Sequence, residues 1–523
     1  MDTKFSILKN IIKKKEIIIV IICLILGFSL RFYTLDKKSL WMDEIYTFND
    51  SRDNLKGHLK YYQETPTHLH PPLFFILTHL FYPFPKPERD LRIIPLIFGT
   101  LSIPMIYFLS RLFCPGIALP CTLSLTFMTY HISLSQDGRS YALILFLGMA
   151  ALYFLMKHLS TSRRTYLLPV ATTYTLLFYT SYASIPFIFL SQVFMFYGVH
   201  SQGQKPRSSS FLILNGLTLL LCIPWILLIM LNYKGQPLMP SFHVEGTGSF
   251  LTILYLIIHD WAPHAPLMIS SIMLLVLFPF FSQNKKNASI LLALFILPVS
   301  GVYLFCKILN ITHFVSSRYF SNFLPPFIIT LYLSLHSIEA KFDKVRKLIR
   351  LKVLFVILFI ASNLSILPFY YRAEKQDFRG LVNYLKVNLR ERDKIFDGQM
   401  GYMPGILHYF GAYPKTRHQI ISIQRGTDNE VHVELPFTYK NKTYTLNWSN
   451  ICCDQYVADG GRLWLVVGVN TAKKFMEVNS FVFKGYFDGS FVNFNKFPSD
   501  ASIYLFLYDP RSPNEKGIDF SIE

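Results

Sequence analysis

The sequence predicts a mainly α-helical, polytopic membrane protein of about 11 transmembrane helices with a C-terminal extracytoplasmic α/β domain. The hydrophobic content of 52%, the 48 phenylalanines and the mean hydropathy of +0.34 exceed what a water-exposed surface tolerates. The apolar residues come in blocks of about 17 to 22, the length that crosses a hydrocarbon core at about 1.5 Å per residue. Beyond residue 367 the composition becomes polar.

The net charge of +19 is spread between the apolar blocks. No basic stripe with interleaved aromatic residues is present in the sequence, which argues against a nucleic-acid-binding protein. The basic groups are Lys13 to Lys15, Arg163 with Arg164, Lys205 with Arg207, Lys285 with Lys286, and Lys341 through Lys352. Because lysine and arginine collect on the cytoplasmic side, this pattern predicts a multi-pass membrane protein with a cytoplasmic N-terminus. High lysine, isoleucine and phenylalanine usage is typical of a low-GC bacterium, so the expected location is the bacterial cytoplasmic (inner) membrane.

The first span, residues 17–32, follows a basic segment but no cleavage pattern follows it, so we expect a retained helix. It delivers an outer loop, residues 36–90. Within this loop, residues 71–84 are apolar but too few for a span and are closed by three prolines, which favours an interfacial helix. Residues 250–258 are predicted to form a second interfacial helix.

The remaining predicted spans alternate in direction, and their inward ends meet basic groups. They are residues 93–109, 116–134, 141–158, 166–180, 183–199, 211–231, 267–281, 290–305, 323–335 and 354–367. An odd number of spans places the C-terminal part outside. We therefore predict a transmembrane catalytic module over residues 1–367 and a soluble extracytoplasmic domain over residues 368–523.

The C-terminal part predicts an α/β domain. Residues 379–389 have a helical pattern, residues 395–396 a strand, and residues 431–435 and 463–469 alternating strands. The seven cysteines have no zinc-binding or disulfide spacing.

The strongest candidate site in the first outer loop is the adjacent pair Asp43 and Glu44, which follows Trp41. Adjacent acids repel each other, and partial desolvation near a bilayer makes such a carboxylate a better proton acceptor for an acceptor hydroxyl. From these two residues alone, an ordinary solvated pair remains the alternative.

Further candidates gather at the predicted outer boundaries. Asp137 is interpreted either as a ligand of a divalent cation, Mg²⁺ or Mn²⁺, or as a partner of Arg139. His70 precedes the interfacial helix as a substrate contact or a solvated cap. Arg92, Arg318 and Tyr319 either bind a lipid phosphate or place snorkelling side chains at the interface. His259, Asp260 and His264 lack metal-site spacing and are expected to be structural.

These motifs, in this order, resemble the GT-C glycosyltransferase superfamily, in particular the bacterial branch of protein mannosyltransferases and aminoarabinose transferases (glycosyltransferase family 39). The elements that carry the resemblance are Leu40-Trp41-Met42-Asp43-Glu44, His70-Pro71-Pro72-Leu73, Asp90-Leu91-Arg92-Ile93-Ile94-Pro95, Gly138-Arg139-Ser140-Tyr141, Arg318-Tyr319-Phe320 and Lys375-Gln376-Asp377-Phe378-Arg379. They cover most of the chain.

The resemblance implies that Asp43 is the catalytic base with Glu44 as its partner, and that Asp137 is the acid of the second outer loop. It implies a polyprenyl-phosphate-linked sugar as donor, with inversion at the sugar. The acceptor would be a glycolipid, polysaccharide or protein of the cell envelope, and membrane lipids are expected partners. His70, Arg92, Arg139, Arg318 and Tyr319 would then contact the substrate or its phosphate.

Three alternatives are weaker. A transporter or flippase is expected to carry ionisable groups in mid-span, whereas these spans are nearly free of them. An O-antigen ligase or polymerase typically places its large soluble part between late spans. A non-catalytic assembly factor would tolerate loss of Asp43.

Overall fold

The computed structural model describes most of the chain in fourteen segments. They are residues 2–64, 70–192, 208–232, 249–282, 285–308, 316–342, 350–398, 401–412, 422–425, 431–449, 461–476, 480–490, 501–511 and 517–518. The basic pair Lys205 and Arg207, the end of the span predicted at 183–199, and Cys452 with Cys453 lie outside these segments.

The chain forms two compact units that are interleaved in the sequence. Unit 1 comprises Met1–Leu35, Asp50–Pro85 and Arg89–Pro368, and unit 2 comprises Asp36–Asn49, Lys86–Glu88 and Phe369–Glu523. The last boundary between the units lies between Pro368 and Phe369. The first outer loop, which we assigned as a whole to the membrane module, is distributed over both units.

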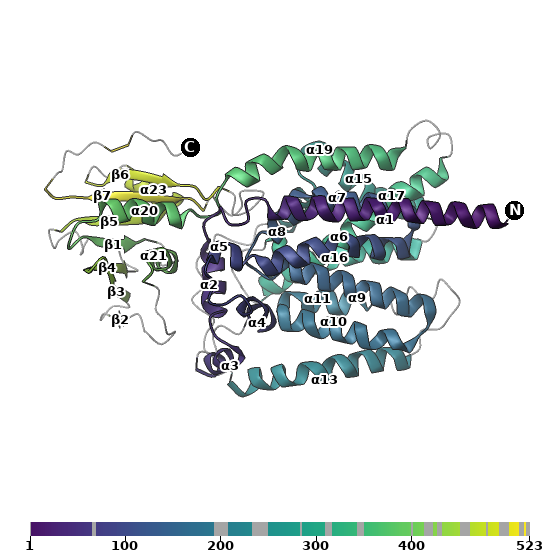
Figure 1. Cartoon of the computed structure of the whole chain (residues 1–523), viewed down its shortest axis with the longest axis horizontal. Coiled ribbons are helices and arrows are strands. Elements are labelled where there is room, and N and C mark those ends of the chain that lie inside the picture. Colours follow the sequence, from purple (N-terminus) through teal and green to yellow (C-terminus); the bar gives the residue numbers. More distant parts are fainter. Residues whose placement is uncertain are drawn as a thin grey trace. The chain divides into compact units, whose positions relative to one another are not determined.

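Unit 1 is built almost entirely of helices (Figure 1). Its helices are α1 (Asp2–Phe32), α3 (Leu55–Glu64), α4 (Leu73–His79), α6 (Ile93–Phe113), α7 (Ala118–Phe127), α8 (Thr129–Ser135), α9 (Tyr141–Thr161), α10 (Leu167–Thr180), α11 (Ile185–Ser191), α13 (Ser208–Asn232), α14 (Phe250–Trp261), α15 (Ala265–Phe281), α16 (Lys285–Ile308), the 3-10 helix η6 (Ser317–Phe323) and α17 (Leu324–Lys341). Three of the described helices cross the unit boundaries: α2 (Met42–Asp50), whose last residue belongs to unit 1, α5 (Pro87–Asp90) and α19 (Leu351–Arg372).

Among the described residues, five helices are long and apolar enough to cross a membrane, or up to seven if each of two bent pairs is one span. The five lie within Pro87–Phe113, Tyr141–Thr161, Ser209–Asn232, Ser317–Lys341 and Leu351–Arg372. Two shorter apolar helices, Tyr182–Ser191 and Leu291–Leu304, accompany them. A polytopic membrane architecture is therefore confirmed, and the count of eleven spans stays a prediction.

The outward-facing side chains of several helices explain why the unit needs lipid. On α13, Leu212, Leu220, Met230 and Leu231 are all exposed, whereas α6 and α9 pack against each other and bury much of their surface. An apolar surface of this extent would be costly in water and is favourable against acyl chains. The exposed isoleucines of α1, Ile18, Ile21 and Ile25 among them, continue this surface.

One predicted element differs in shape. The segment 116–134 was expected to be a single span, but α7 and α8 meet at Met128 with a bend of 61°. Met128 has extended backbone angles, so its peptide does not continue the helix. The amide of Thr129, which starts α8, donates instead to the Asn363 side chain of α19 at 3.0 Å. The segment 250–258, predicted to be an interfacial helix, is helical as part of α14, which is bent by 114° against α15; its position at the membrane interface stays a prediction.

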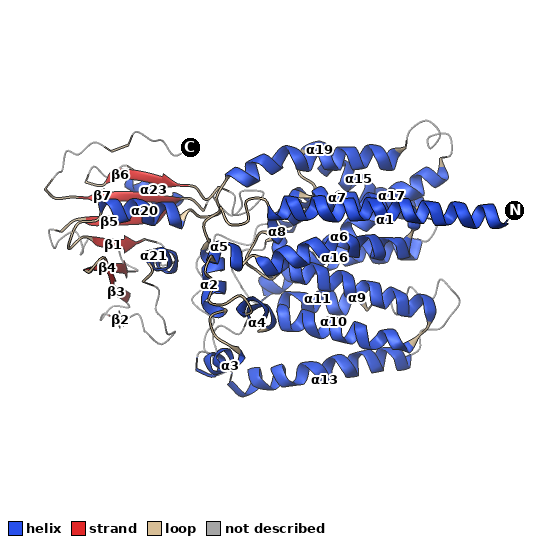
Figure 2. Ribbon diagram, in the orientation of Figure 1, coloured by secondary structure: helices blue, strands red, loops and turns tan. Residues whose placement is uncertain are grey.

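Unit 2 contains a mixed seven-stranded sheet (Figure 2). Its strand order is β2 (Ser422–Arg425), β3 (Val431–Tyr439), β4 (Lys442–Ser449), β1 (Lys394–Asp397), β5 (Leu463–Gly468), β7 (Ile503–Tyr508) and β6 (Val482–Phe487). The pairs of β1 with β4 and with β5 are parallel, and all others are antiparallel. The helices are α2 (Met42–Asp50), α20 (Phe378–Asn388), α21 (Met403–Phe410) and α23 (Val469–Phe475). The predicted α/β class is confirmed.

The burial pattern of the strand β5 differs from the one predicted. We expected alternation over residues 463–469, but all six residues of β5 are buried, and Val469 begins α23. A central strand covered on both faces has a continuous apolar sequence, as Leu463 to Val467 does.

Candidate functional site

The predicted acid pair lies at the start of α2 in unit 2, where its two members have different environments. Glu44 is fully buried, and its Oε2 accepts a long hydrogen bond of 3.4 Å from the Trp41 amide, one residue before the helix. This contact satisfies an amide that the helix leaves without a partner. Asp43 is only half-buried, and the positive end of the helix dipole favours its negative charge. Asp43 is therefore the more accessible carboxylate.

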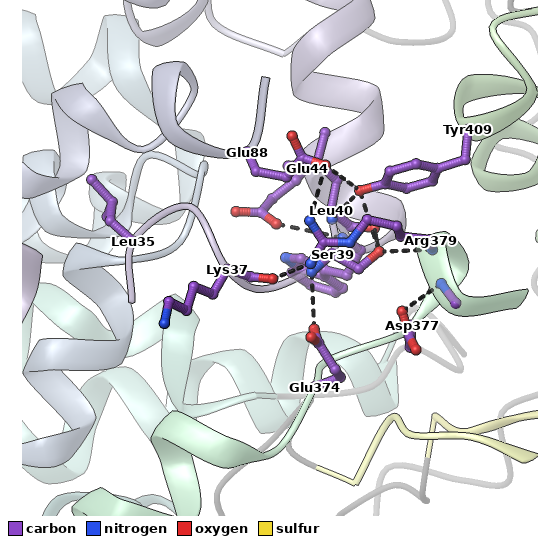
Figure 3. Close-up of polar contacts among 12 residues, drawn as sticks. Leu35, Lys37, Ser39, Leu40, Glu44, Glu88, Glu374, Asp377, Arg379 and Tyr409 are labelled. Atoms are coloured by element: carbon purple, nitrogen blue, oxygen red, sulfur yellow. Dashed lines mark hydrogen bonds and ion pairs between the residues drawn. The ribbon is translucent and has the colours of Figure 1, made fainter. Parts of the chain in front are cut away.

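The segment that carries the pair, residues 37–44, is held by the chain that follows α19 (Figure 3). We call residues 37–44 the acid loop. The Ser39 amide donates to Glu374 Oε2 at 3.0 Å, and the Met42 amide donates to Gln376 Oε1 at 3.0 Å. Lys375 Nζ lies 5.2 Å from the centre of the Trp41 ring. Two motifs about 330 residues apart in the sequence thus form one structure.

Further contacts anchor the N-terminal end of the acid loop. Lys38 Nζ donates to the carbonyl oxygens of Tyr370 and, at 2.6 Å, of Ala373, and lies over the Tyr370 ring. Arg379 donates to the Lys37 carbonyl, and its amide donates to Ser39 Oγ at 3.2 Å. None of these partners was expected from the sequence, although Lys375 through Arg379 had been recognised as a motif.

Burial and charge tune one carboxyl group beside the acid loop. Burial, together with the nearby Asp377 carboxylate, raises the pKa of Glu374 to about 7, and Lys38 and the Ser39 amide only partly offset this. The backbone amide of Glu374 donates to Asp488 Oδ2 at 2.7 Å. That bond, with the amide and hydroxyl of Ser490 and the Tyr486 hydroxyl, holds the pKa of Asp488 below its usual range despite burial.

The other predicted site residues lie in unit 1. Arg92 is buried and donates to the Leu35 carbonyl at 2.9 Å, which fixes the exit of α1. Asp137 is also buried, and its carbonyl accepts a hydrogen bond from the Arg139 amide at 2.6 Å. His70 is exposed just before α4, with its ring 6.4 Å from that of Phe75. Their predicted contacts with substrate remain predictions.

Arg318 and Tyr319 begin the 3-10 helix η6 and are half-exposed. The guanidinium of Arg318 lies 5.7 Å from the centre of the Tyr141 ring, and its Nε donates to Ser316 Oγ at 3.3 Å. Tyr141 is the first residue of α9, two positions after Arg139. Within unit 1 the structure therefore brings the Arg318 motif against the motif that contains Arg139.

Asp260, which we expected to be structural, belongs to a buried network next to Arg318. Ser317 Oγ donates to Asp260 Oδ2 at 2.5 Å, and the Tyr130 hydroxyl donates to Ser317 Oγ at 2.9 Å. The sequence signal for this network was an acid at the end of an apolar helix, which is costly unless it is paired.

Arg31 is a second buried residue that the sequence did not single out. It is fully buried at the end of α1, and its guanidinium donates to the Leu125 and Thr126 carbonyls at 3.0 and 3.2 Å and to His131 Nδ1 at 2.6 Å. Those carbonyls end α7, where the helix leaves acceptors without partners. Gln136 in turn donates to the Arg31 and Tyr33 carbonyls. The end of α1 thus caps the end of α7, and Gln136, which follows α8, caps the end of α1.

No group of three or more histidine, cysteine, aspartate or glutamate residues is arranged for a metal ion among the described segments. Magnesium is commonly held by one or two carboxylates together with substrate phosphates and water, so a single carboxylate such as Asp137 remains compatible with a cation.

The fold combines a membrane module of apolar helices, an acid-bearing loop after the first helix and a C-terminal α/β unit, and this class of architecture is similar to the GT-C fold. The particular structure to which the chain is similar is ArnT, an aminoarabinose transferase, from Cupriavidus metallidurans. For its apo state the TM-score is 0.52 with 11% sequence identity over 97% of this chain and 99% of ArnT. A structure of the same protein bound to undecaprenyl phosphate gives a TM-score of 0.49 with 12% identity over 93% and 97%.

At this identity the likeness establishes the fold alone. No protein-family model and no curated protein matches the sequence.

Proposed function

We propose that this chain is a membrane glycosyltransferase that moves a sugar from a polyprenyl-phosphate-linked donor to an acceptor of the bacterial cell envelope, on the outer face of the cytoplasmic membrane. The acceptor would be a glycolipid, a polysaccharide or a protein. The GT-C fold over nearly the whole chain supports this proposal. The observation that carries it is the placement of Asp43, half-buried at the N-terminus of a helix whose start is fixed by the chain after the last span.

In the proposed reaction Asp43 is the general base. An acceptor hydroxyl oxygen attacks C1 of the donor sugar as its proton passes to the Asp43 carboxylate. The bond between C1 and the phosphate oxygen breaks, and its electron pair stays on the polyprenyl phosphate. Attack from the face opposite the phosphate inverts the configuration at C1. The structural role of Glu44 as a helix cap supports a single base, with Glu44 maintaining its position.

Arginine side chains would stabilise the charge that the phosphate gains. A guanidinium fork matches phosphate oxygens in a bidentate geometry. Arg318 and Arg139 are half-exposed, which suits contact with a ligand, whereas Arg92 is buried against a carbonyl. Tyr319 and His70 are accessible for contacts with the donor. If a cation such as Mg²⁺ or Mn²⁺ takes part, Asp137 is the residue that would hold it, and the cation would offset phosphate charge.

The test compares two isosteric variants, Asp43→Asn and Glu44→Gln, each expressed in a strain that lacks the gene. Mass spectrometry of envelope glycolipids and glycoproteins identifies the product that the deletion removes and measures its restoration. Asp43→Asn is expected to lower transfer by a factor of about 10² to 10⁴, the usual contribution of a general base. Glu44→Gln keeps an acceptor oxygen for the Trp41 amide and is expected to retain most of the transfer.

Near-normal product formation by Asp43→Asn, at normal protein levels, would rule out this role of Asp43. An unchanged glycan profile in the deletion strain, with lipid transport altered, would favour a transporter.

A further inference from the structure

The hydroxyl group of Tyr409, on α21, connects the C-terminal unit's own helix to the acid loop (Figure 3). It accepts a hydrogen bond of 2.7 Å from the Leu40 amide and one of 3.3 Å from Ser39 Oγ. It donates one of 3.1 Å to Glu88 Oε1. One phenol oxygen thus joins residues 39 and 40 to residue 88, using both its acceptor and its donor capacity.

The orientation of the Leu40 amide affects the direction in which α2 begins. Leu40 is fully buried and lies two residues before the helix, so its amide has no helical carbonyl to pair with. Tyr409 supplies an acceptor there, and Gln376 supplies one at Met42. The orientation of these two peptides sets the first turn of α2, and Asp43 lies in that turn.

Tyr409 is itself held rigidly by the sheet. Asp397, the last residue of β1, is buried, and its Oδ2 accepts from the amides of Tyr402 and Met403 at 2.9 and 2.7 Å, at the start of α21. At the other end of α21, the Phe410 ring packs on the Phe437 ring at 4.9 Å. A functional group is placed accurately when its own support is fixed by such contacts.

We propose that Tyr409 is a positioning residue for glycosyl transfer: through the Leu40 amide it fixes the start of α2 so that the Asp43 carboxylate meets the acceptor hydroxyl. This inference rests on the proposed function of Asp43 as the base. It makes the C-terminal α/β unit part of the catalytic apparatus.

The experiment uses the full-length protein with Tyr409→Phe, which removes only the hydroxyl. The matched control is Tyr439→Phe, on a ring that packs 5.4 Å from that of Phe410 in the same unit. A second variant, Gln376→Met, removes the acceptor of the Met42 amide at similar length. Four quantities are compared: product per enzyme in the complemented deletion strain, the thermal midpoint in detergent, the affinity for undecaprenyl phosphate, and amide hydrogen exchange over residues 37–44.

Tyr409→Phe and Gln376→Met are expected to reduce transfer roughly 10- to 100-fold, as a displaced catalytic group does, and to accelerate exchange in the acid loop. The thermal midpoint and undecaprenyl phosphate affinity should stay at the level of Tyr439→Phe. Purely structural loss would instead lower the thermal midpoint and the affinity for undecaprenyl phosphate together with transfer, and that result would overturn the proposal. Transfer by Tyr409→Phe equal to that of Tyr439→Phe would also overturn it.

The Asp43→Asn variant separates the two levels of inference. An inactive Asp43→Asn beside a fully active Tyr409→Phe removes the positioning role and leaves the proposed function standing. A fully active Asp43→Asn removes the base and, with it, any positioning that acts through Asp43.

Discussion

Glu374 illustrates at the scale of one residue how the acid loop is coupled to pH. Its pKa is raised from 4.5 to about 7, chiefly by burial and the Asp377 carboxylate. A carboxyl group whose folded pKa is raised stabilises the fold below its unfolded pKa, and this contribution is lost as the pH rises through the folded pKa. The window for Glu374 is therefore pH 4.5 to about 7.

We predict that Glu374→Gln raises the free energy of unfolding at pH 8 by roughly 1–3 kcal/mol relative to the wild type and has little effect at pH 4.5. The amide oxygen still accepts from the Ser39 amide, whereas the unfavourable ionisation is gone. Thermal unfolding in detergent at both pH values measures the difference. An equal shift at both pH values would show that ionisation of Glu374 is not responsible.

Asp43 and Glu44 show what a sequence can and cannot reveal about a site. The two adjacent acids after a membrane exit identified the region, because adjacent carboxylates repel each other and one of them becomes a better proton acceptor. The different environments of Asp43 and Glu44 depend on partners far along the chain, so the two residues alone offer no basis for ranking them, and only the family resemblance favoured Asp43. Tyr409 carried no signal at all, because an isolated tyrosine in a helix is ordinary.

At the scale of elements, the break between α7 and α8 is the feature that hydropathy missed. Residues 116–134 are apolar throughout, so their composition indicates a continuous span. The break is stabilised by polar contacts from other helices, from Arg31 on α1 and Asn363 on α19. An arginine at the end of a helix or an asparagine within one carries no sequence signal for the distant carbonyl or amide that it will contact.

We predict that Arg31→Gln lowers the free energy of unfolding by roughly 2–4 kcal/mol, because the Leu125 and Thr126 carbonyls lose charge-assisted donors. The control is Arg163→Gln, an exposed arginine in a connection between helices. The thermal midpoint of each purified variant in detergent provides the measurement. Equal midpoints would mean that the break holds without Arg31.

At the scale of the whole molecule, the helices could be predicted from the sequence because a lipid bilayer requires long apolar segments. The basic groups between these segments indicated the direction of each span. The interleaving of the two units along the chain could not be predicted from the sequence. Residues 36–49 and 86–88 belong with the C-terminal unit through contacts such as that of Tyr409 with Glu88, and pairings over such a separation leave no periodicity in the sequence.

This interleaving makes a prediction about sidedness. Because residues 36–49 and 369–523 form one unit, both must lie on the same side of the membrane. We expect alkaline phosphatase fused after residue 40 and after residue 523 to be active, and fusions after Arg163 to be inactive. Opposite results for the two fusions at residues 40 and 523 would contradict the shared unit and the proposed outer site together.

The acid loop is synthesised long before the residues that hold it in place. Met42 leaves the ribosome 334 residues before Gln376. At about 5–20 residues per second, roughly 15–70 s of translation separate the two. In the proposed function, a nascent chain therefore carries the Asp43 carboxylate, the proposed base, across the bilayer long before Gln376 and Tyr409 can orient it. Products that terminate before α21 are then expected to be inserted yet inactive.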